Sequence, residues 1–157
     1  RENNGYGEQM SIDDSDMKIL HELAKDSRLS FRAIGKKLGL ATTTVIHRYE
    51  KMKKDGVIKY PSAIIDHEKL GYNIVAMIEL VVSKGKLVDD EERIAKKHNV
   101  YAVYDITGDM DAVILARFKD RKELNDFVKS LLATEFVERT NTHLVLNVVK
   151  EDLNATI

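Results

Sequence analysis

The spacing of apolar residues changes at Gly56, and this change constrains the fold more than any other feature of the 157-residue chain. Before Gly56 apolar residues recur at helical intervals, whereas after it strand-like segments alternate with helical ones. The two periods place side chains on different faces, so a segment patterned for one structure does not suit the other. The sequence therefore predicts a helical N-terminal domain followed by an α+β domain.

Three helices are predicted in the N-terminal part. Asp13 or Asp14 can cap the first, and Ser30 can cap the second. Gly39 ends the second helix, because glycine readily adopts the left-handed conformation of a sharp exit. The third helix spans Thr42–Lys54. Two helices joined by a tight glycine turn are typical of a helix-turn-helix.

The second half predicts a different architecture. Val57–Ile65 has strand-forming residues interrupted by Pro61, which indicates an exposed connecting strand. The segments that follow are predicted to be strand, helix, strand, strand, helix and strand: residues 73–82, 87–98, 100–107, 111–118, a helix capped by Asp120, and 137–149. This is the ferredoxin-like βαββαβ order. The predicted fold class is α+β, with a winged-type helix-turn-helix of three helices before the ferredoxin-like domain.

The pattern also divides the chain into parts. The predicted parts are a disordered leader (1–10), the helix-turn-helix domain (11–60), a linker (61–72), the α+β effector-binding and oligomerisation domain (73–150) and a tail (151–157). The two helices of the second domain should cover one face of its sheet. Its other face should pack against a second copy, since its apolar residues would otherwise meet water.

Composition excludes several classes of protein. The chain contains no Cys, so disulfides and zinc–thiolate sites are impossible. No signal-peptide pattern is present and no apolar run approaches the ~18 residues of a membrane span, which favours a cytoplasmic protein without membrane contact. The five His lack metal-ligand spacing, and no nucleotide-binding or nucleophile motif is found. We therefore predict no catalytic residue, metal or cofactor.

The net charge of −1 conceals a basic segment. Residues 27–54 carry eight basic residues and one acid, a net charge of +7, so the rest of the chain carries −8. A compact basic segment in a nearly neutral protein indicates contact with a polyanion. A solvated helical face is the alternative reading of this charge.

The third helix provides the residues expected to contact DNA, because the second helix of such a motif enters the major groove. Thr43, Thr44 and His47 can contact phosphates or bases, and Arg48 can make a bidentate contact with guanine. Lys51 is better placed for phosphates. The full predicted DNA-binding set is Arg28, Arg32, Lys36, Thr42, Thr43, Thr44, His47, Arg48, Lys51 and Lys54. A three-helix bundle used only for packing or protein contact is the alternative.

Residues 12–60 (IDDSDMKILHELAKDSRLSFRAIGKKLGLATTTVIHRYEKMKKDGVIKY) resemble the DNA-binding domain of the Lrp/AsnC, or feast/famine, transcriptional regulators. The second half resembles the ligand-sensing domain of that family, notably TGDMD at 107–111 and RTNTHLVL at 139–146. The resemblance implies homodimers formed through bare sheet faces, often assembled into octamers, on palindromic double-stranded operators. Three features depart from the family pattern, one of which is Tyr60-Pro61 in place of a common Gly-Tyr. Ala41 replaces a Ser cap, so Thr42 or Thr43 is expected to cap instead, and Gly35 replaces an Ala.

The resemblance also places an amino acid or related metabolite near the Gly-Asp-x-Asp turn, at interfaces between subunits. Free turn amides suit a carboxylate, and an Asp side chain suits an ammonium. The candidate effector-binding residues are Gly108, Asp109, Met110, Asp111, Thr140 and Thr142. The alternative is that the turn only closes a hairpin and that the Thr pair only forms strand.

Two other functions are compatible with this architecture. Sirohaem decarboxylases resemble Lrp/AsnC proteins, and in them His and Arg of the second domain would handle the carboxylates of a tetrapyrrole. The residues available for this here are Arg93, Arg117, Arg121, Arg139, His98 and His143. A metabolite sensor that has lost DNA binding is the other possibility, but the intact basic helix argues against it. We therefore predict a DNA-binding transcriptional regulator that responds to an amino acid or related metabolite.

Overall fold

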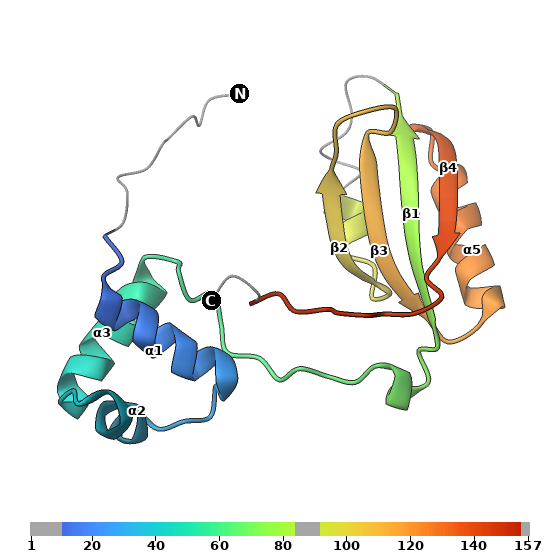
Figure 1. The fold of residues 1–157 in the computed structure, drawn as a ribbon. Helices are drawn as coiled ribbons and strands as arrows, with labels where there is room; N and C mark the ends of the chain where they lie inside the picture. Colours follow the sequence, from blue (N-terminus) through green and yellow to red (C-terminus); the bar gives the residue numbers. More distant parts are fainter. Residues whose placement is uncertain (1–10, 84–91, 155–157) are drawn as a thin grey trace. The chain divides into compact units, whose positions relative to one another are not determined.

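The computed structural model describes residues 11–83 and 92–154, and these form two compact units (Figure 1). Of the described residues, 11–64 and 151–154 belong to the first unit, and the second spans Ile65–Lys150. The division falls inside the segment expected to be a linker. The predicted leader at residues 1–10 lies outside the described residues. No helix in the described part is long and apolar enough to cross a membrane.

The first unit consists of α1 (Asp14–Lys25), α2 (Phe31–Leu38) and α3 (Thr42–Lys54). Asp13 caps α1 by accepting hydrogen bonds from the backbone N–H groups of Ser15 and Asp16, and Ser30 caps α2 through the N–H of Ala33. Gly39 ends α2 with φ = 69°, a left-handed conformation. The three predicted helices are confirmed, because their start and stop signals act locally.

The core of this unit is made by one inward face from each helix. Ile19, Ile34, Val45 and Met52 are buried together. Gly35 lies at the closest approach of the turn, because a Cβ built there would stand 2.6 Å from the backbone oxygen of Leu40. The α2–α3 turn is therefore packed too tightly for a larger side chain without a shift.

Two expectations about the first unit are wrong. Ala41 is the N-cap of α3 and makes no side-chain capping bond, so neither Thr42 nor Thr43 replaces the missing Ser. Within the described residues, Val57–Ile65 forms no strand, and the helix-turn-helix therefore carries no wing strand here. A lone extended segment has no partner strand for its backbone groups, and Pro61 also lacks an N–H.

The second unit is a four-stranded antiparallel sheet in the order β2-β3-β1-β4. Its elements are the 3₁₀ turn η1 (Glu68–Leu70), β1 (Ile74–Val82), a helical stretch at residues 92–95, β2 (Val100–Asp105), β3 (Ala112–Phe118), α5 (Arg121–Leu132) and β4 (Val137–Leu144). Asp120 caps α5 as predicted. This order and pairing confirm the ferredoxin-like arrangement.

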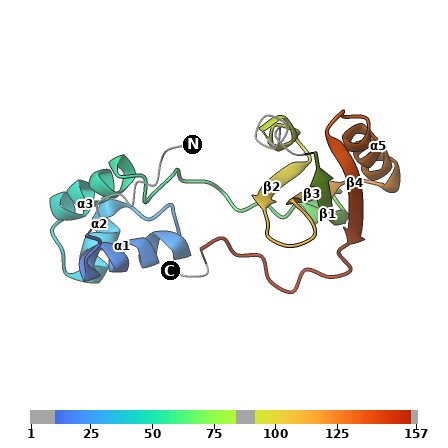
Figure 2. The ribbon, with the colours of Figure 1, turned by 90° about the horizontal axis from the view of Figure 1, so that it is seen from above.

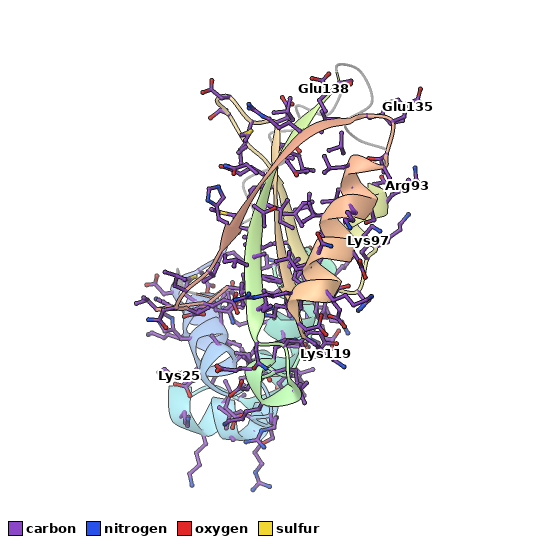
Figure 3. All side chains as sticks on the ribbon, turned by 90° about the vertical axis from the view of Figure 1, so that its right-hand side faces the viewer. Lys25, Arg93, Lys97, Lys119, Glu135 and Glu138 are labelled. Carbon is purple, nitrogen blue, oxygen red and sulfur yellow. The ribbon has the colours of Figure 1, made fainter. Side chains whose placement is uncertain are left out.

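Both helical segments of this unit cover the same face of the sheet (Figure 2). Ala76, Ile78 and Leu80 of β1 belong to the same buried core as Phe127 and Leu131 of α5. Lys97 lies beside α5 (Figure 3), with its Nζ 5.7 Å from the centroid of the Phe127 ring. The helix-facing side of the sheet thus forms the core.

The opposite face carries the alternate residues of the same strands. Met77 and Leu115 are register partners there, and both are only partly buried. We call this surface, represented by Met77, Glu79, Val113 and Leu115, the bare face. It mixes apolar side chains with charged and polar ones.

Three predicted boundaries in this unit are wrong. Strand β4 ends at Leu144 rather than residue 149, because the segment beyond it has only one backbone bond to β1, from Val145 N–H to Val75 O. The connection between β2 and β3 spans six residues, 106–111, and is longer than a tight hairpin. Of the helix predicted at 87–98, residues 87–91 lie outside the described residues, and only 92–95 of the remainder are helical.

Candidate DNA interface and effector site

The outward face of α3 is the candidate DNA interface. Thr43, His47 and Lys51 are exposed, whereas Thr44 is half-buried. These four side chains share a hollow of about 560 Å³ with Arg48 and with residues at the start of α1. The helical repeat brings positions 43, 44, 47, 48 and 51 to one side of α3, as expected for a surface that meets a groove.

The other basic residues expected at this interface lie at the margins. Arg32 and Lys36 are exposed on α2, and Lys54 is exposed at the end of α3. Arg28 is paired with Asp26, with its Nε 3.2 Å from the carboxylate, and this contact lowers the pKa of Asp26. Thr42 is exposed in the first turn of α3. Arg28 is thus the one of these residues whose charge is partly offset by a near neighbour.

Arg48 lies differently from the sequence-based expectation. Its Nη1 stands 2.7 Å from Asp13 Oδ2 and 2.9 Å from Asp16 Oδ1, both at the start of α1. The hydrogen bonds that Arg48 donates to these carboxylates raise the pKa of Arg48, and the Asp16 N–H and the guanidinium lower the pKa of Asp13. In this structure the guanidinium is engaged with two carboxylates of the protein itself.

The candidate effector site is a cavity of about 600 Å³ beside the 106–111 connection. Its lining residues are Glu79, Ile106, Thr107, Asp109, Met110, Arg139, Thr140 and Asn141. Of the six expected effector residues, the structure brings Asp109, Met110 and Thr140 together here. Gly108, Asp111 and Thr142 are not among the lining residues.

Asp111 makes structural contacts at this connection. Its Oδ2 accepts a hydrogen bond of 2.8 Å from the N–H of Val82, and its own N–H donates to Leu80 O at 2.9 Å. The carboxylate thereby ties the β2–β3 connection to the end of β1. Asp109 is exposed at the cavity, and its carboxylate is therefore the better candidate for a ligand.

The register of β4 places Thr140 and Thr142 on the same side of the strand. Thr140 and Thr142 pair with Leu80 and Ile78, which face the helices, so both Thr belong to that side of the sheet. Asn141 and His143 alternate with them and belong to the bare face. Of the two expected Thr residues, Thr140 lines the cavity and Thr142 does not, and Asn141 between them lines it as well.

Three hydrogen-bonded side chains occupy the β1–β4 edge of the bare face. Asn141 Nδ2 donates to Glu79 Oε2 at 2.9 Å, and His143 Nε2 lies 2.9 Å from the same oxygen. These contacts, led by His143, lower the pKa of Glu79. Glu79 and Asn141 also line the cavity, and Arg139 Nη2 there lies 3.7 Å from Met110 Sδ. The cavity therefore holds anionic, cationic and apolar side chains together.

Three residues that line the cavity, Glu79, Arg139 and Asn141, were not expected from the sequence to bind an effector. Arg139 and His143 had been considered only for tetrapyrrole chemistry. No group of three or more His, Asp or Glu in the described residues is arranged to hold a metal ion. The alternation of β4 could have indicated Arg139 and Asn141 if its register with β1 had been known.

Comparison with known proteins identifies the family of this chain. The sequence model of the AsnC-type helix-turn-helix domain matches residues 12–53, and that of the Lrp/AsnC ligand binding domain matches residues 75–155. The chain belongs to the Lrp/AsnC family. It is a transcriptional regulator with a DNA-binding and a ligand-binding domain. The first match includes the exposed residues of α3 described above, and the second includes the residues that line the cavity.

Individual relatives agree with this assignment. The chain is 45% identical over 143 residues to an HTH-type transcriptional regulator of Pyrococcus furiosus, covering 91% of this chain and 97% of the relative. It is 40% identical to the regulator FL11 of the same organism, covering 89% and 93%. Neither name describes an enzyme.

Solved structures match the fold. LrpC of B. subtilis has a TM-score of 0.81 at 26% identity, covering 90% of this chain and 99% of LrpC. A transcriptional regulator of Neisseria meningitidis, solved as a complex with L-Met, has a TM-score of 0.82 at 23% identity, covering 94% and 100%. The α+β architecture is thus that of the Lrp/AsnC proteins.

Proposed function

We propose that this Lrp/AsnC regulator binds a palindromic operator as a dimer and that an amino acid in the cavity of its second unit changes that binding. The observation that carries the proposal is the exposed set on α3, with Thr43, His47 and Lys51 on one side of the helix. Hydroxyl, imidazole and ammonium groups can contact both bases and phosphates. The basic segment around them, with a net charge of +7, attracts a polyanion.

The cavity supports an amino acid as the effector. Arg139 offers a guanidinium for a carboxylate, and Asp109 and Glu79 offer carboxylates for an ammonium. Ile106 and Met110 add apolar surface on which the side chain of the ligand would pack. A zwitterion with an apolar side chain complements all three features.

Selection of duplexes from a randomised pool tests DNA binding. The full chain should enrich a palindrome whose half-sites lie about 34 Å apart, one helical turn, because two recognition helices act together. The selected duplex should bind ~10³-fold or more tightly than a scrambled duplex at the same salt concentration. Enrichment of no motif would contradict the proposal.

Calorimetric titration of the full chain with each of the twenty amino acids tests the effector site. Asp109→Asn should weaken binding of the active amino acid by about tenfold or more, since it removes a charged hydrogen bond to the ammonium. Asp111→Asn is the matched control, because its amide oxygen can still accept from the N–H of Val82. Equal affinity of the wild type and Asp109→Asn would contradict the site, as would equal losses in both variants.

We propose no catalytic role, cofactor or membrane partner, and a cytoplasmic location suits a protein that binds DNA. Nothing in the described residues favours the sirohaem decarboxylase alternative. Among the Arg and His considered for tetrapyrrole binding, Arg139 is the one that lines the cavity. A protein purified without colour, and without an absorption change on addition of a tetrapyrrole, would agree with a regulator.

A further inference from the structure

Arg48 occupies a junction between α1 and α3. Its guanidinium contacts two carboxylates of α1 across 35 and 32 residues of sequence. The Arg48 side chain is 29% exposed, and that of Asp16 is only 6% exposed. A guanidinium held by a carboxylate that is nearly out of solvent has little freedom to turn toward DNA, because leaving would strand a buried charge.

The two carboxylates are themselves held in place by the start of α1. Asp13 Oδ1 accepts from the N–H groups of Ser15 and Asp16, and Asp16 Oδ2 accepts from the N–H of Asp13. This capping box holds both carboxylates in place independently of Arg48. Arg48 therefore meets a rigid acceptor pair instead of two mobile surface side chains.

We infer that Arg48 is a positioning residue for DNA recognition: it fixes α3 to the capped start of α1 and does not itself read a base. Thr44, one turn before Arg48, and Lys51, three residues after it, border the same hollow. Fixing Arg48 against α1 therefore fixes the rotation of α3 about its own axis. That rotation determines where the exposed Thr43 and His47 point.

The two acids allow a test, because the two possible roles of Arg48 predict opposite changes in operator affinity when an acid is neutralised. Asp13 and Asp16 line the hollow on the DNA-facing side, where negative charge repels phosphates. If Arg48 reads a base, neutralising Asp16 frees the guanidinium and removes repulsion, so operator binding should strengthen. If Arg48 positions α3, neutralising Asp16 loosens the helix and operator binding should weaken.

The experiment measures binding of the full chain to the duplex that the wild type selects from a randomised pool. Asp16→Asn is compared with Asp14→Asn, which removes the same charge from an exposed side chain in the same turn. We expect Asp16→Asn and Arg48→Ala each to lose about tenfold in affinity, the scale of one charged hydrogen bond, and Asp14→Asn to lose nothing. The double variant Arg48→Ala/Asp16→Asn should bind no more weakly than Arg48→Ala alone.

Salt dependence separates positioning from phosphate contact. Arg48→Ala should leave the slope of log affinity against log salt unchanged, whereas Lys51→Ala should reduce it by about 0.9. If Asp16→Asn does not fold, Asp13→Asn replaces it, because Asn caps a helix as well as Asp. The inference would be overturned if Asp16→Asn, or the variant that replaces it, bound the operator at least as tightly as Asp14→Asn. A reduced salt slope in Arg48→Ala would also overturn it.

Discussion

At the residue scale, Asp13 combines a helix cap with an ion pair. Its carboxylate accepts two backbone N–H groups of α1 and the guanidinium of Arg48. These contacts, led by the N–H of Asp16, lower the pKa of Asp13 below its ordinary value of 3.8. Protonation in the folded state is therefore harder than in the unfolded chain.

The sign of this shift predicts a pH dependence of stability. A lowered pKa in the folded state adds stability that is present above the ordinary value and is lost as pH falls through the folded value. Asp13→Asn keeps the cap and removes the charge. At pH 7 the free energy of unfolding should be larger for the wild type than for Asp13→Asn. This difference should disappear at the lowest pH, where Asp13 is protonated. Denaturant titrations from pH 7 to pH 2 check this, and a gap that persists there would contradict it.

Lys51 is the residue for which phosphate contact is the simplest prediction. Its side chain is exposed on the DNA-facing side of α3. Lys51→Ala should weaken binding to selected and scrambled duplexes alike, because a phosphate contact carries no base information. Fluorescence anisotropy with both duplexes measures this. Lys129→Ala, on α5 of the other unit, is the control, and a loss confined to the selected duplex would instead indicate base contact.

Sequence reasoning at this scale succeeded where the determinants are local. The caps Asp13, Ser30 and Asp120 are confirmed because a cap depends on residues within three positions. Asp16, which pairs with Arg48, lies more than thirty residues away, and no pattern within α3 indicates this contact. The Glu79–His143 contact spans 64 residues and depends on strand register, which the sequence does not specify.

At the element scale, the α2–α3 turn predicts a substitution effect. Gly35→Ala should raise the helix propensity of α2 by up to ~1 kcal/mol. However, its Cβ would stand 2.6 Å from Leu40 O, and overpacking of this kind costs ~1–3 kcal/mol. We expect a net loss of stability, measured as a lower Tm of the full chain. Lys36→Ala, exposed on the same helix, should change Tm little, and a higher Tm for Gly35→Ala would show that the turn relaxes.

The helices and strands of this chain were predictable to different degrees. Helices α1, α2 and α3 began and ended where their caps and glycines indicated. Strand boundaries depended on pairing, so β4 stopped at Leu144, although the apolar pattern continued to residue 149. The connecting strand expected at 57–65 failed for the same reason, since strand structure requires a partner.

At the scale of the whole molecule, the bare face predicts assembly. Met77 and Leu115 face each other there outside the helix-covered core. We expect the full chain to be at least dimeric through this face, and octamers would require further contacts. Leu115→Lys should give monomers in sedimentation equilibrium, because burying an ammonium beside Met77 between two copies costs more than leaving it in water. Leu132→Lys, at an exposed position on α5, should remain assembled. A Leu115→Lys variant with the mass of the wild-type assembly would contradict this face.

The segment that joins the two units has a consequence for protease action. Tyr60 is 73% exposed and Ile64 is 92% exposed. From Lys59 to Asp66 no backbone group makes a backbone hydrogen bond to another described residue. Such a segment can enter the extended active-site cleft of a protease, whereas helices and paired strands must first open. Brief digestion with trypsin should therefore cut after Lys59 before it cuts within the helices and paired strands that the structure describes. One scission there would sever gene recognition from metabolite sensing while the peptide bonds within α1, α2, α3 and the strands of the sheet stay intact.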